Sequence, residues 1–235
     1  MRLKRVLLKI SGEALAGAEG HGLSAHFLRT LASELKHVAT AGTQLALVIG
    51  AGNLFRGEAE CGGGLSRVSA DYIGMLGTVM NSLALADILG AVGAHAVVQS
   101  AVEVPSVCDY VNPKRAIRHL EDGDIVIFAG GTGNPFFTTD TTAALRASEI
   151  QADAVLKATK VDGVYTADPK KDPRAKRFDT ITYSDVIQRK LKVMDLTAIT
   201  LCQTNKLPII VFNVTTPGNI RRVLAGKAIC TRVVP

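Results

Sequence analysis

Short apolar runs recur along the chain, and longer stretches with helical spacing of apolar residues separate them. The runs predict strands at residues 5–10, 44–49, 94–98, 125–128, 154–158, 209–212 and 228–233. Helices are predicted between them, at residues 24–40, 69–89, 113–120, 141–150, 184–191, 195–203 and from 217 onward. Most of the strand runs are apolar throughout, as in parallel strands that are buried on both faces. The pattern predicts an α/β fold, a three-layer αβα sandwich around a mostly parallel sheet.

No linker, internal repeat or low-complexity segment interrupts this alternation, so a single domain is predicted over residues 1–235. A chain of 235 residues with 47% hydrophobic and 20% charged residues is long and apolar enough to bury one large core. We find no signal-peptide core and no apolar run that approaches membrane-spanning length. The four cysteines are dispersed and form no CxxC pair. A cytoplasmic protein without a membrane partner is expected.

The formal net charge of +6 is compatible with a nucleic-acid surface or with a site for phosphorylated small molecules. The basic residues are spread along the chain, and the one local cluster, Lys170–Arg177, is interrupted by Asp172 and Pro173. We interpret that cluster as a solvated loop. A phosphate-binding cleft is therefore the preferred explanation, and nucleic acid is not an expected partner.

Polar and glycine-rich segments follow several predicted strands. Lys9 interrupts the first strand near its end, the segment Gly50–Gly57 follows the second, and Gly130–Asp140 follows the strand 125–128. In open α/β sheets these carboxyl ends meet at one edge, where ligands bind. Two adjacent phenylalanines, Phe136 and Phe137, suggest a cleft wall. An ordinary strand-to-helix connection with Asp140 as a helix cap, and a surface role for Lys9, are the alternatives.

The chemistry of these loops points to phosphate. No GxxxxGK[ST] motif occurs, no GxGxxG follows the first strand, and no HExxH or Ser-His-Asp arrangement is visible. The five histidines lie outside the strand-end loops, and we assign them no role. Phosphoryl transfer needs positive charge around the moving group and an aligned acceptor. The glycine loops could bind phosphate, and four charged residues could surround the transferred group: Lys9, Arg56, Asp140 and Asp195. From the residues alone, a phosphate-handling α/β enzyme is predicted.

Several blocks resemble the bacterial uridylate (UMP) kinases, in the same order and over nearly the whole chain. They are KISGEAL (residues 9–15), GAGNLFRG (50–57), TGNPFFTTD (132–140), KATKVDGVY (157–165), ADP (167–169) and KVMDL (192–196). The third and fourth blocks are long and specific. Within the amino-acid-kinase fold, which also holds aspartate, acetylglutamate and carbamate kinases, they single out the UMP enzymes.

The resemblance implies ATP-dependent conversion of UMP to UDP with Mg²⁺, in pyrimidine nucleotide biosynthesis. By the family pattern, the residues that bind ATP are Lys9, Ile10, Ser11, Gly12, Gly52, Arg56, Thr159, Tyr165 and Asp168. Those that bind UMP are Ala51, Asp71 and the run Thr132, Gly133, Asn134, Pro135, Phe136, Phe137, Thr138 and Thr139. The catalytic set is Lys9, Arg56, Asp140 and Asp195.

Individual roles are also implied by the resemblance. Asp71 would meet the ribose hydroxyls of UMP; an acidic residue that complements a helix dipole is its alternative. Asp140 and Asp195 would organise charge around the lysine and the metal, and neither would act as a general base. No residue is assigned as a metal ligand. The family is typically a hexamer, inhibited by UTP and activated by GTP.

Two local features depart from the family pattern. Ala51 stands where the family usually has glycine, and its N–H stays available to phosphate if its φ is negative. Family members that bind GTP use basic side chains on the long helix and after it, where this chain has Ala86, Gly90 and Val97. UTP inhibition is therefore expected, whereas the uncharged residues weigh against GTP activation.

Two other functions remain open from the sequence. One is another acid kinase of the same fold that makes an acyl phosphate, although it would not need the Phe136–Phe137 wall. The other is a uridine-nucleotide sensor that binds without catalysis; the presence of Lys9 and Asp140 weighs against it. The fold alone does not decide among them.

Overall fold

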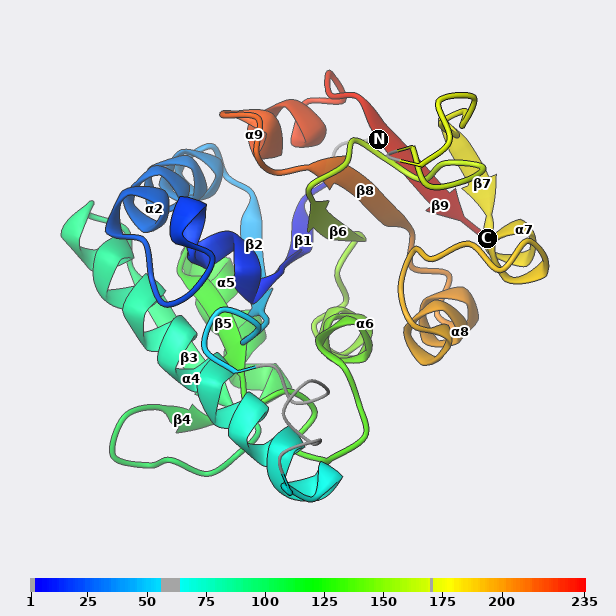
Figure 1. Cartoon of the computed structure of the whole chain (residues 1–235). Helices are drawn as coiled ribbons and strands as arrows, with labels where there is room; N and C mark the ends of the chain where they lie inside the picture. Colours follow the sequence, from blue (N-terminus) through cyan, green and yellow to red (C-terminus); the bar gives the residue numbers. More distant parts are fainter. Residues whose placement is uncertain (1–2, 56–63, 170) are drawn as a thin grey trace.

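A computed structural model of the chain describes residues 3–55, 64–169 and 171–235. Its described strands form one nine-stranded sheet in the order β4-β3-β5-β2-β1-β6-β8-β9-β7 (Figure 1). Their bounds are β1 Arg5–Ile10, β2 Gln44–Ile49, β3 Ala96–Ser100, β4 Asp109–Tyr110, β5 Ile125–Ala129, β6 Ala154–Thr159, β7 Thr180–Thr182, β8 Ile209–Asn213 and β9 Cys230–Val234. The pairings are parallel except that of β8 with β9. The predicted mostly parallel sheet is confirmed.

Helices cover both faces of the sheet. One face is covered by α2, α4 and α9, and the other by α5, α6, α7 and α8. The helix bounds are α1 Gly12–Leu15, η1 Gly17–Glu19, α2 Ala25–Thr40, α4 Arg67–Ala91, α5 Pro113–Asp122, α6 Thr139–Glu149, α7 Tyr183–Gln188, α8 Leu196–Thr204 and α9 Asn219–Leu224. The three-layer arrangement is therefore as predicted.

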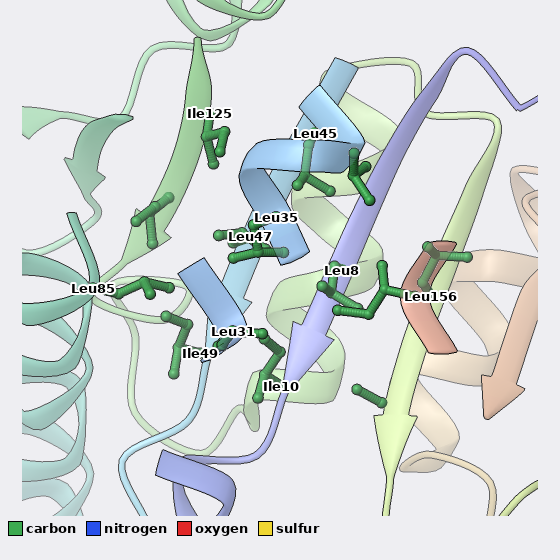
Figure 2. Packing of buried hydrophobic residues seen from close by; sticks show 14 of the residues in the cluster. Leu8, Ile10, Leu31, Leu35, Leu45, Leu47, Ile49, Leu85, Ile125 and Leu156 are labelled. Atoms are coloured by element: carbon green, nitrogen blue, oxygen red, sulfur yellow. The ribbon is translucent and has the colours of Figure 1, made fainter. Parts of the chain in front are cut away.

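Alternating side chains of the central strands feed the two cores. In β1, Leu8 and Ile10 point into the core under α2 and α4, whereas Leu7 belongs to the core on the opposite face. Figure 2 shows the first core, in which Leu31 and Leu35 of α2 pack against these strands. Because strands buried on both faces need apolar residues at every position, a charged residue in such a strand requires a specific partner.

Hydrogen bonds at the ends of elements explain where the boundaries differ from prediction. The helix expected from residue 69 begins at Arg67, because the Ser66 hydroxyl accepts from the N–H of Ser69. The strand expected at 94–98 lies at Ala96–Ser100, since the Ala94 N–H still closes the end of α4 on the Leu89 carbonyl, at 2.9 Å. The two short strands β4 and β7 were not predicted.

The long helix α4 corrects one expectation. Residues Arg67–Ala91 are long and apolar enough, by length and composition, to cross a membrane, so the expectation that no run approaches that length is wrong. Inside the fold this helix packs on the sheet, with Val79, Leu85 and Leu89 buried in the first core. The core therefore accounts for part of its apolar residues, while Val68, Leu76 and Met80 stay exposed.

Candidate active site

The loops after β1 and β2 touch at the carboxyl edge of the sheet. A Cβ placed on Gly12 would lie 2.5 Å from the Gly50 carbonyl oxygen, so the two loops approach more closely than any side chain allows. Two buried amides fix them: the Asn53 and Asn81 side chains bond to each other, and Asn81 Nδ2 also donates to the Gly50 carbonyl at 2.7 Å. Helix α4 thus anchors the glycine loop to the first strand.

An ion cluster lies beside these loops. Lys9 of β1 and Lys157 of β6 are register neighbours on adjacent strands. Their ammonium groups lie 2.9 and 2.7 Å from the two different oxygens of the Asp140 carboxylate. The three side chains are only 12–15% exposed. Two buried cations on neighbouring strands are thus balanced by one carboxylate from the first turn of α6.

The electrostatics of the cluster follow from its burial and its two positive charges. Burial raises the pKa of Asp140, but the charges of Lys9 and Lys157 and their hydrogen bonds outweigh it and hold that pKa below its usual range. Burial also lowers the pKa of the Lys157 ammonium, against the attraction of Asp140. A carboxylate whose pKa is lowered and whose oxygens face two ammonium groups is a poor proton acceptor.

Asp140 does not cap its helix. The Thr138 hydroxyl accepts from the N–H groups of Asp140 and Thr141, at 3.0 and 3.3 Å, and so begins α6 at Thr139. The alternative of Asp140 as a helix cap is therefore wrong. With Thr138 as the cap, the Asp140 side chain is free to turn towards the two lysines.

Asp195 holds a second junction. Its carboxylate accepts from the N–H of Ala198 at 2.9 Å and caps α8. It also accepts hydrogen bonds from the hydroxyls of Thr138 and Thr141, which joins α8 to the start of α6. Its hydrogen bonds thus go to α6 and α8, while its charge raises the pKa of Lys157. Its predicted part in organising charge stays a prediction.

One pocket, of about 310 Å³, opens between α4 and the loop before α6. Arg67, Met75 and Thr78 line it together with seven of the residues expected to bind UMP or phosphate: Ala51, Gly52, Asp71, Asn134, Phe137, Thr138 and Thr139. Thr132, Gly133, Pro135 and Phe136 are not among its lining residues. Ala51 has no positive φ, so the condition for its N–H to face phosphate is met.

The wall of this pocket is held by Asp71. Its carboxylate accepts from the backbone N–H of Phe136 at 2.7 Å and from Arg67 Nε at 2.9 Å. Phe136 has φ = 72°, a left-handed conformation that costs a bulky side chain energy, and its ring is 65% exposed under the Arg67 guanidinium. The strain is sustained by the Asp71 bond, and such strain clusters at ligand sites.

A second pocket, of about 430 Å³, lies on the other side of the ion cluster. Lys9, Ser11 and Thr159 line it as expected for ATP-binding residues, and Lys157 joins them. Tyr165 and Asp168 are not among its lining residues; the Tyr165 hydroxyl donates to Asp162 instead. The Ile10 side chain is buried in the core and Gly12 is buried, so both can offer only backbone atoms.

A third, mostly apolar pocket of about 620 Å³ lies between α7 and α8, with Asp140 and Lys157 in its wall. The two polar residues are thus shared between the ion cluster and this cavity. Arg56, expected in the catalytic set, lies outside the described residues.

Three residues at the site were missed by sequence reasoning: Lys157, Asn81 and Thr78. Lys157 carried a signal, because it interrupts the apolar run of β6 as Lys9 interrupts that of β1. Thr78 accepts from the Gly130 N–H at 2.8 Å and fixes the loop after β5, and Asn81 fixes the loop after β2. Both lie in the middle of α4, where the sequence gives no sign of a role.

Comparison with known proteins decides the family. The profile of the amino acid kinase family matches residues 4–213. The chain belongs to the amino acid kinase family. It is 55% identical to the uridylate kinase of Pseudomonas putida over 227 residues, covering 97% of this chain and 92% of that protein. The resemblance to bacterial UMP kinases is confirmed.

Solved structures agree with this family. The UMP kinase of Bacillus anthracis superposes with a TM-score of 0.96 at 39% identity, over 100% of this chain and 97% of that one. The UMP kinase of Ureaplasma parvum gives 0.95 at 34% identity over the whole of both chains. The uridylate kinase of Archaeoglobus fulgidus gives 0.76 at 30% identity, over 97% and 99%.

Proposed function

We propose that this protein transfers the γ-phosphoryl group of ATP to UMP and forms UDP, as a step of pyrimidine nucleotide biosynthesis. The observation that carries the proposal is the ion cluster between two pockets. Thr138 and Thr139 line one pocket, Lys9 and Lys157 line the other, and Asp140, the next residue after Thr139, pairs with both lysines. Positive charge at the junction of two nucleotide-sized pockets suits a phosphoryl group in transit.

The pocket beside Asp71 is the proposed UMP site. Asp71 would accept hydrogen bonds from the ribose hydroxyls, and the segment Thr132–Thr139 would surround the uracil and the sugar. The glycine loop with Ala51 would turn its N–H groups to the phosphate. Phe137 lines this pocket and is half exposed, which is the expected state of a ring that a base would cover.

The pocket with Lys9, Ser11 and Thr159 is the proposed ATP site. Backbone N–H groups between Lys9 and Gly12, and that of Gly52, would hold the phosphates, with Arg56 close to the transferred group. Tyr165 and Asp168 are proposed to face the nucleoside of ATP. Their segment follows β6, the strand that also brings Lys157 to this pocket.

No general base is needed in this reaction, because the acceptor oxygen of UMP is already anionic. Lys9 would lower the repulsion between the two anionic phosphates and stabilise the charge that spreads over the transferred group. Asp140, with its lowered pKa, would keep the lysines in place while the substrates enter. The chemistry is thus one of positioning and charge.

Mg²⁺ is proposed to accompany ATP and to neutralise the phosphate charge in the transfer. Among the described residues, no group of three or more His, Cys, Asp or Glu side chains is placed to hold a metal. That fits an ion held largely by the nucleotide phosphates and water, as Mg²⁺ commonly is in kinases.

The test is the formation of ADP from Mg-ATP with UMP, CMP, dUMP or aspartate as separate acceptors. Turnover with UMP above the others is expected. Turnover with aspartate would instead favour the acyl-phosphate kinase. Tight binding of UMP or UTP without turnover would favour the uridine-nucleotide sensor.

UTP is proposed as a feedback inhibitor, because it carries the same uridine group that the UMP site would recognise. Inhibition should then be competitive with UMP. GTP activation is not expected, since Ala86, Gly90 and Val97 offer no charge to a third nucleotide. A repeat of the assay with GTP should leave the rate unchanged, and a several-fold increase would contradict that expectation.

A homo-oligomer, a hexamer by family resemblance, is proposed for the assembled enzyme. Support comes from an exposed apolar face of α4 at helical spacing: Val68, Tyr72, Ile73, Leu76 and Met80, each 38–59% exposed. Sedimentation should give a mass several times 24.8 kDa, and Met80→Glu should reduce it. A monomer at micromolar concentration would contradict the proposal. The proposed location is the cytoplasm, with neither membrane nor nucleic acid as a partner.

The chain is proposed to form a single domain. Consistent with this, the central strand β1 pairs with β2 on one side and with β6 on the other. Both proposed nucleotide pockets use residues of these strands or of the loops that follow them.

A further inference from the structure

Lys157 has no role in the predicted site, yet its ammonium group makes two contacts within the protein. Its ammonium group binds Asp140 at 2.7 Å and also donates a hydrogen bond to the Val193 carbonyl. Val193 lies two residues before Asp195, the cap of α8. Lys157 therefore links three segments: β6, the first turn of α6, and the segment that leads into α8.

We propose that Lys157 is a positioning residue for phosphoryl transfer: it holds the Asp140 carboxylate so that Lys9 points at the transferred group. This inference rests on the proposed function. It concerns how the two lysines share one carboxylate.

The geometry separates the tasks of the two lysines. They bind different oxygens of Asp140, so the carboxylate is fixed at both ends and cannot rotate to follow one lysine alone. Lys157 has a second acceptor, the Val193 carbonyl, that anchors it away from the strand edge. Within the described part of the chain, the Lys9 ammonium contacts Asp140 and has no second acceptor of this kind. Lys9 is the lysine with donors to offer a phosphate, and Lys157 is the one held by protein.

The charge balance supports the same division. Two ammonium groups on neighbouring strands repel each other, and Asp140 offsets both. A substrate phosphate that binds the Lys9 ammonium competes with Asp140 for it. Without Lys157, the Asp140 carboxylate would be free to move with Lys9 or to rotate away. The ion pair with Lys157 holds the carboxylate in position. Since a displacement of about 1 Å in a reacting group costs on the order of a hundredfold in rate, such an anchor has a direct effect on turnover.

Among the described residues, the groups that act on the charge of Asp140 are Lys9 from β1 and Lys157 from β6; Cys202 of α8 feels the charge of Asp140, and Asp195 acts on Lys157. Removal of Lys157 leaves Lys9 as the one cation among the described residues that binds the carboxylate. Burial, which opposes ionisation of Asp140, then has less to offset it. The pKa of Asp140 rises, and the loss of activity on acidification begins at a higher pH.

The experiment compares Lys157→Met with Lys36→Met. Lys36 is also half-buried and donates to a backbone carbonyl, that of Val92 at 2.6 Å, but at the far end of α4. The control removes the same kind of lysine–carbonyl bond without touching the ion cluster. Both variants and the wild type are assayed with UMP and Mg-ATP from pH 9 down to the acid unfolding of each protein, so that the range extends below the usual carboxyl pKa of about 3.9, and their melting temperatures are measured.

For Lys157→Met, kcat is expected to fall on the order of a hundredfold while the KM for UMP changes about twofold or less. The acid limb of kcat should move to higher pH. Lys36→Met should match the wild type in both respects. A lower melting temperature of Lys157→Met with an unmoved acid limb would assign Lys157 a structural role only and overturn the inference.

A double variant separates action through Asp140 from direct contact with substrate. If Lys157 acts through the carboxylate, Lys157→Met should cost little further kcat in an Asp140→Asn background. Additive losses would overturn the inference. A wild type without UMP turnover would instead contradict the proposed function, so the two failures are distinguishable.

Discussion

Two carboxylates of this molecule are buried to a similar extent, but their cationic partners differ in exposure. Asp140 lies between two lysines under the strand ends, and the three side chains are 12–15% exposed. Asp71 lies in the wall of the neighbouring pocket between the Arg67 guanidinium and the Phe136 N–H; its side chain is 18% exposed and that of Arg67 is 45% exposed. The two clusters therefore differ in their cations, which are buried around Asp140 and open to solvent beside Asp71.

The difference in the exposure of the cations separates two tasks. Charges in a site shielded from water act strongly on one another and on any charge that develops nearby, so the Asp140 cluster is suited to the transition state. The Asp71 cluster is screened by water and holds backbone shape, so it is suited to recognition of the bound substrate. The first should therefore control kcat, and the second the KM for one substrate.

The largest effect is expected from Asp140→Ala. Without the carboxylate, the positive charges of Lys9 and Lys157 repel each other with no negative charge between them, and the Lys9 ammonium is no longer held in one orientation. We expect kcat to fall by about a thousandfold or more, in line with the loss of a preorganised electrostatic group, while the circular dichroism spectrum stays that of the wild type. An active variant would remove Asp140 from the mechanism.

A smaller and more selective effect is expected from Asp71→Ala. The KM for UMP should rise by about tenfold or more, the usual result of losing a charged hydrogen-bond acceptor, and the KM for ATP should change less. Asp71→Asn is the matched control, because its amide oxygen can still accept from the Phe136 N–H. An equal rise for both substrates would contradict the ribose assignment and the comparison of the two clusters.

Acid unfolding should also distinguish the two clusters. A carboxylate with a lowered folded pKa adds stability above its unfolded pKa of about 3.9, and that stability is lost as the pH falls through the folded value. The melting temperature of Asp140→Asn should thus differ from that of the wild type at neutral pH. The difference between the two curves should begin to shrink below about pH 4 and should vanish only below the lowered folded pKa of Asp140. A difference that stays constant as the pH falls below about 4, down to the acid unfolding of the wild type, would show that Asp140 does not stabilise through its charge.

The layers of the fold could be predicted from the sequence because the central strands are mostly apolar and several helices begin at a polar cap residue. Ser24 and Asp195 were predicted as helix starts, and both cap their helices. The predicted boundaries of elements were wrong where a backbone N–H forms a hydrogen bond in a neighbouring element, as the Ala94 N–H does with the Leu89 carbonyl at the end of α4. Strand order could not be predicted, since it depends on contacts between segments that are distant in the chain.

The same limit explains which parts of the site were missed. Lys9 and Lys157 give an identical signal, a lysine in an apolar strand. Their common partner emerges only once β1 and β6 are neighbours. The direction of Asp140 depends on whether the helix is capped at Thr138 or two residues later. Asn81 pairs with Asn53 across 28 positions. Single residue types predicted the kind of chemistry, and the fold supplied their partners.

The smallest effect is expected from a change at the contact between α4 and the loop that carries Ala51. A Cβ on Gly77 would lie 2.9 Å from the Cβ of Ala51, so Ala51 fits because Gly77 faces it. Gly77→Ala should be destabilising by about 1–3 kcal/mol through overpacking, and should raise the KM for UMP because the added methyl group displaces the loop that carries Ala51. Ala51→Gly in the same chain removes the clash and leaves the gain in helix propensity, which is about 1 kcal/mol. The double variant should therefore recover both melting temperature and KM. A double variant no better than Gly77→Ala would show that α4 sets the position of this loop through Asn81 alone, and the exposed pocket would then depend on the helix as rigidly as the buried cluster depends on its strands.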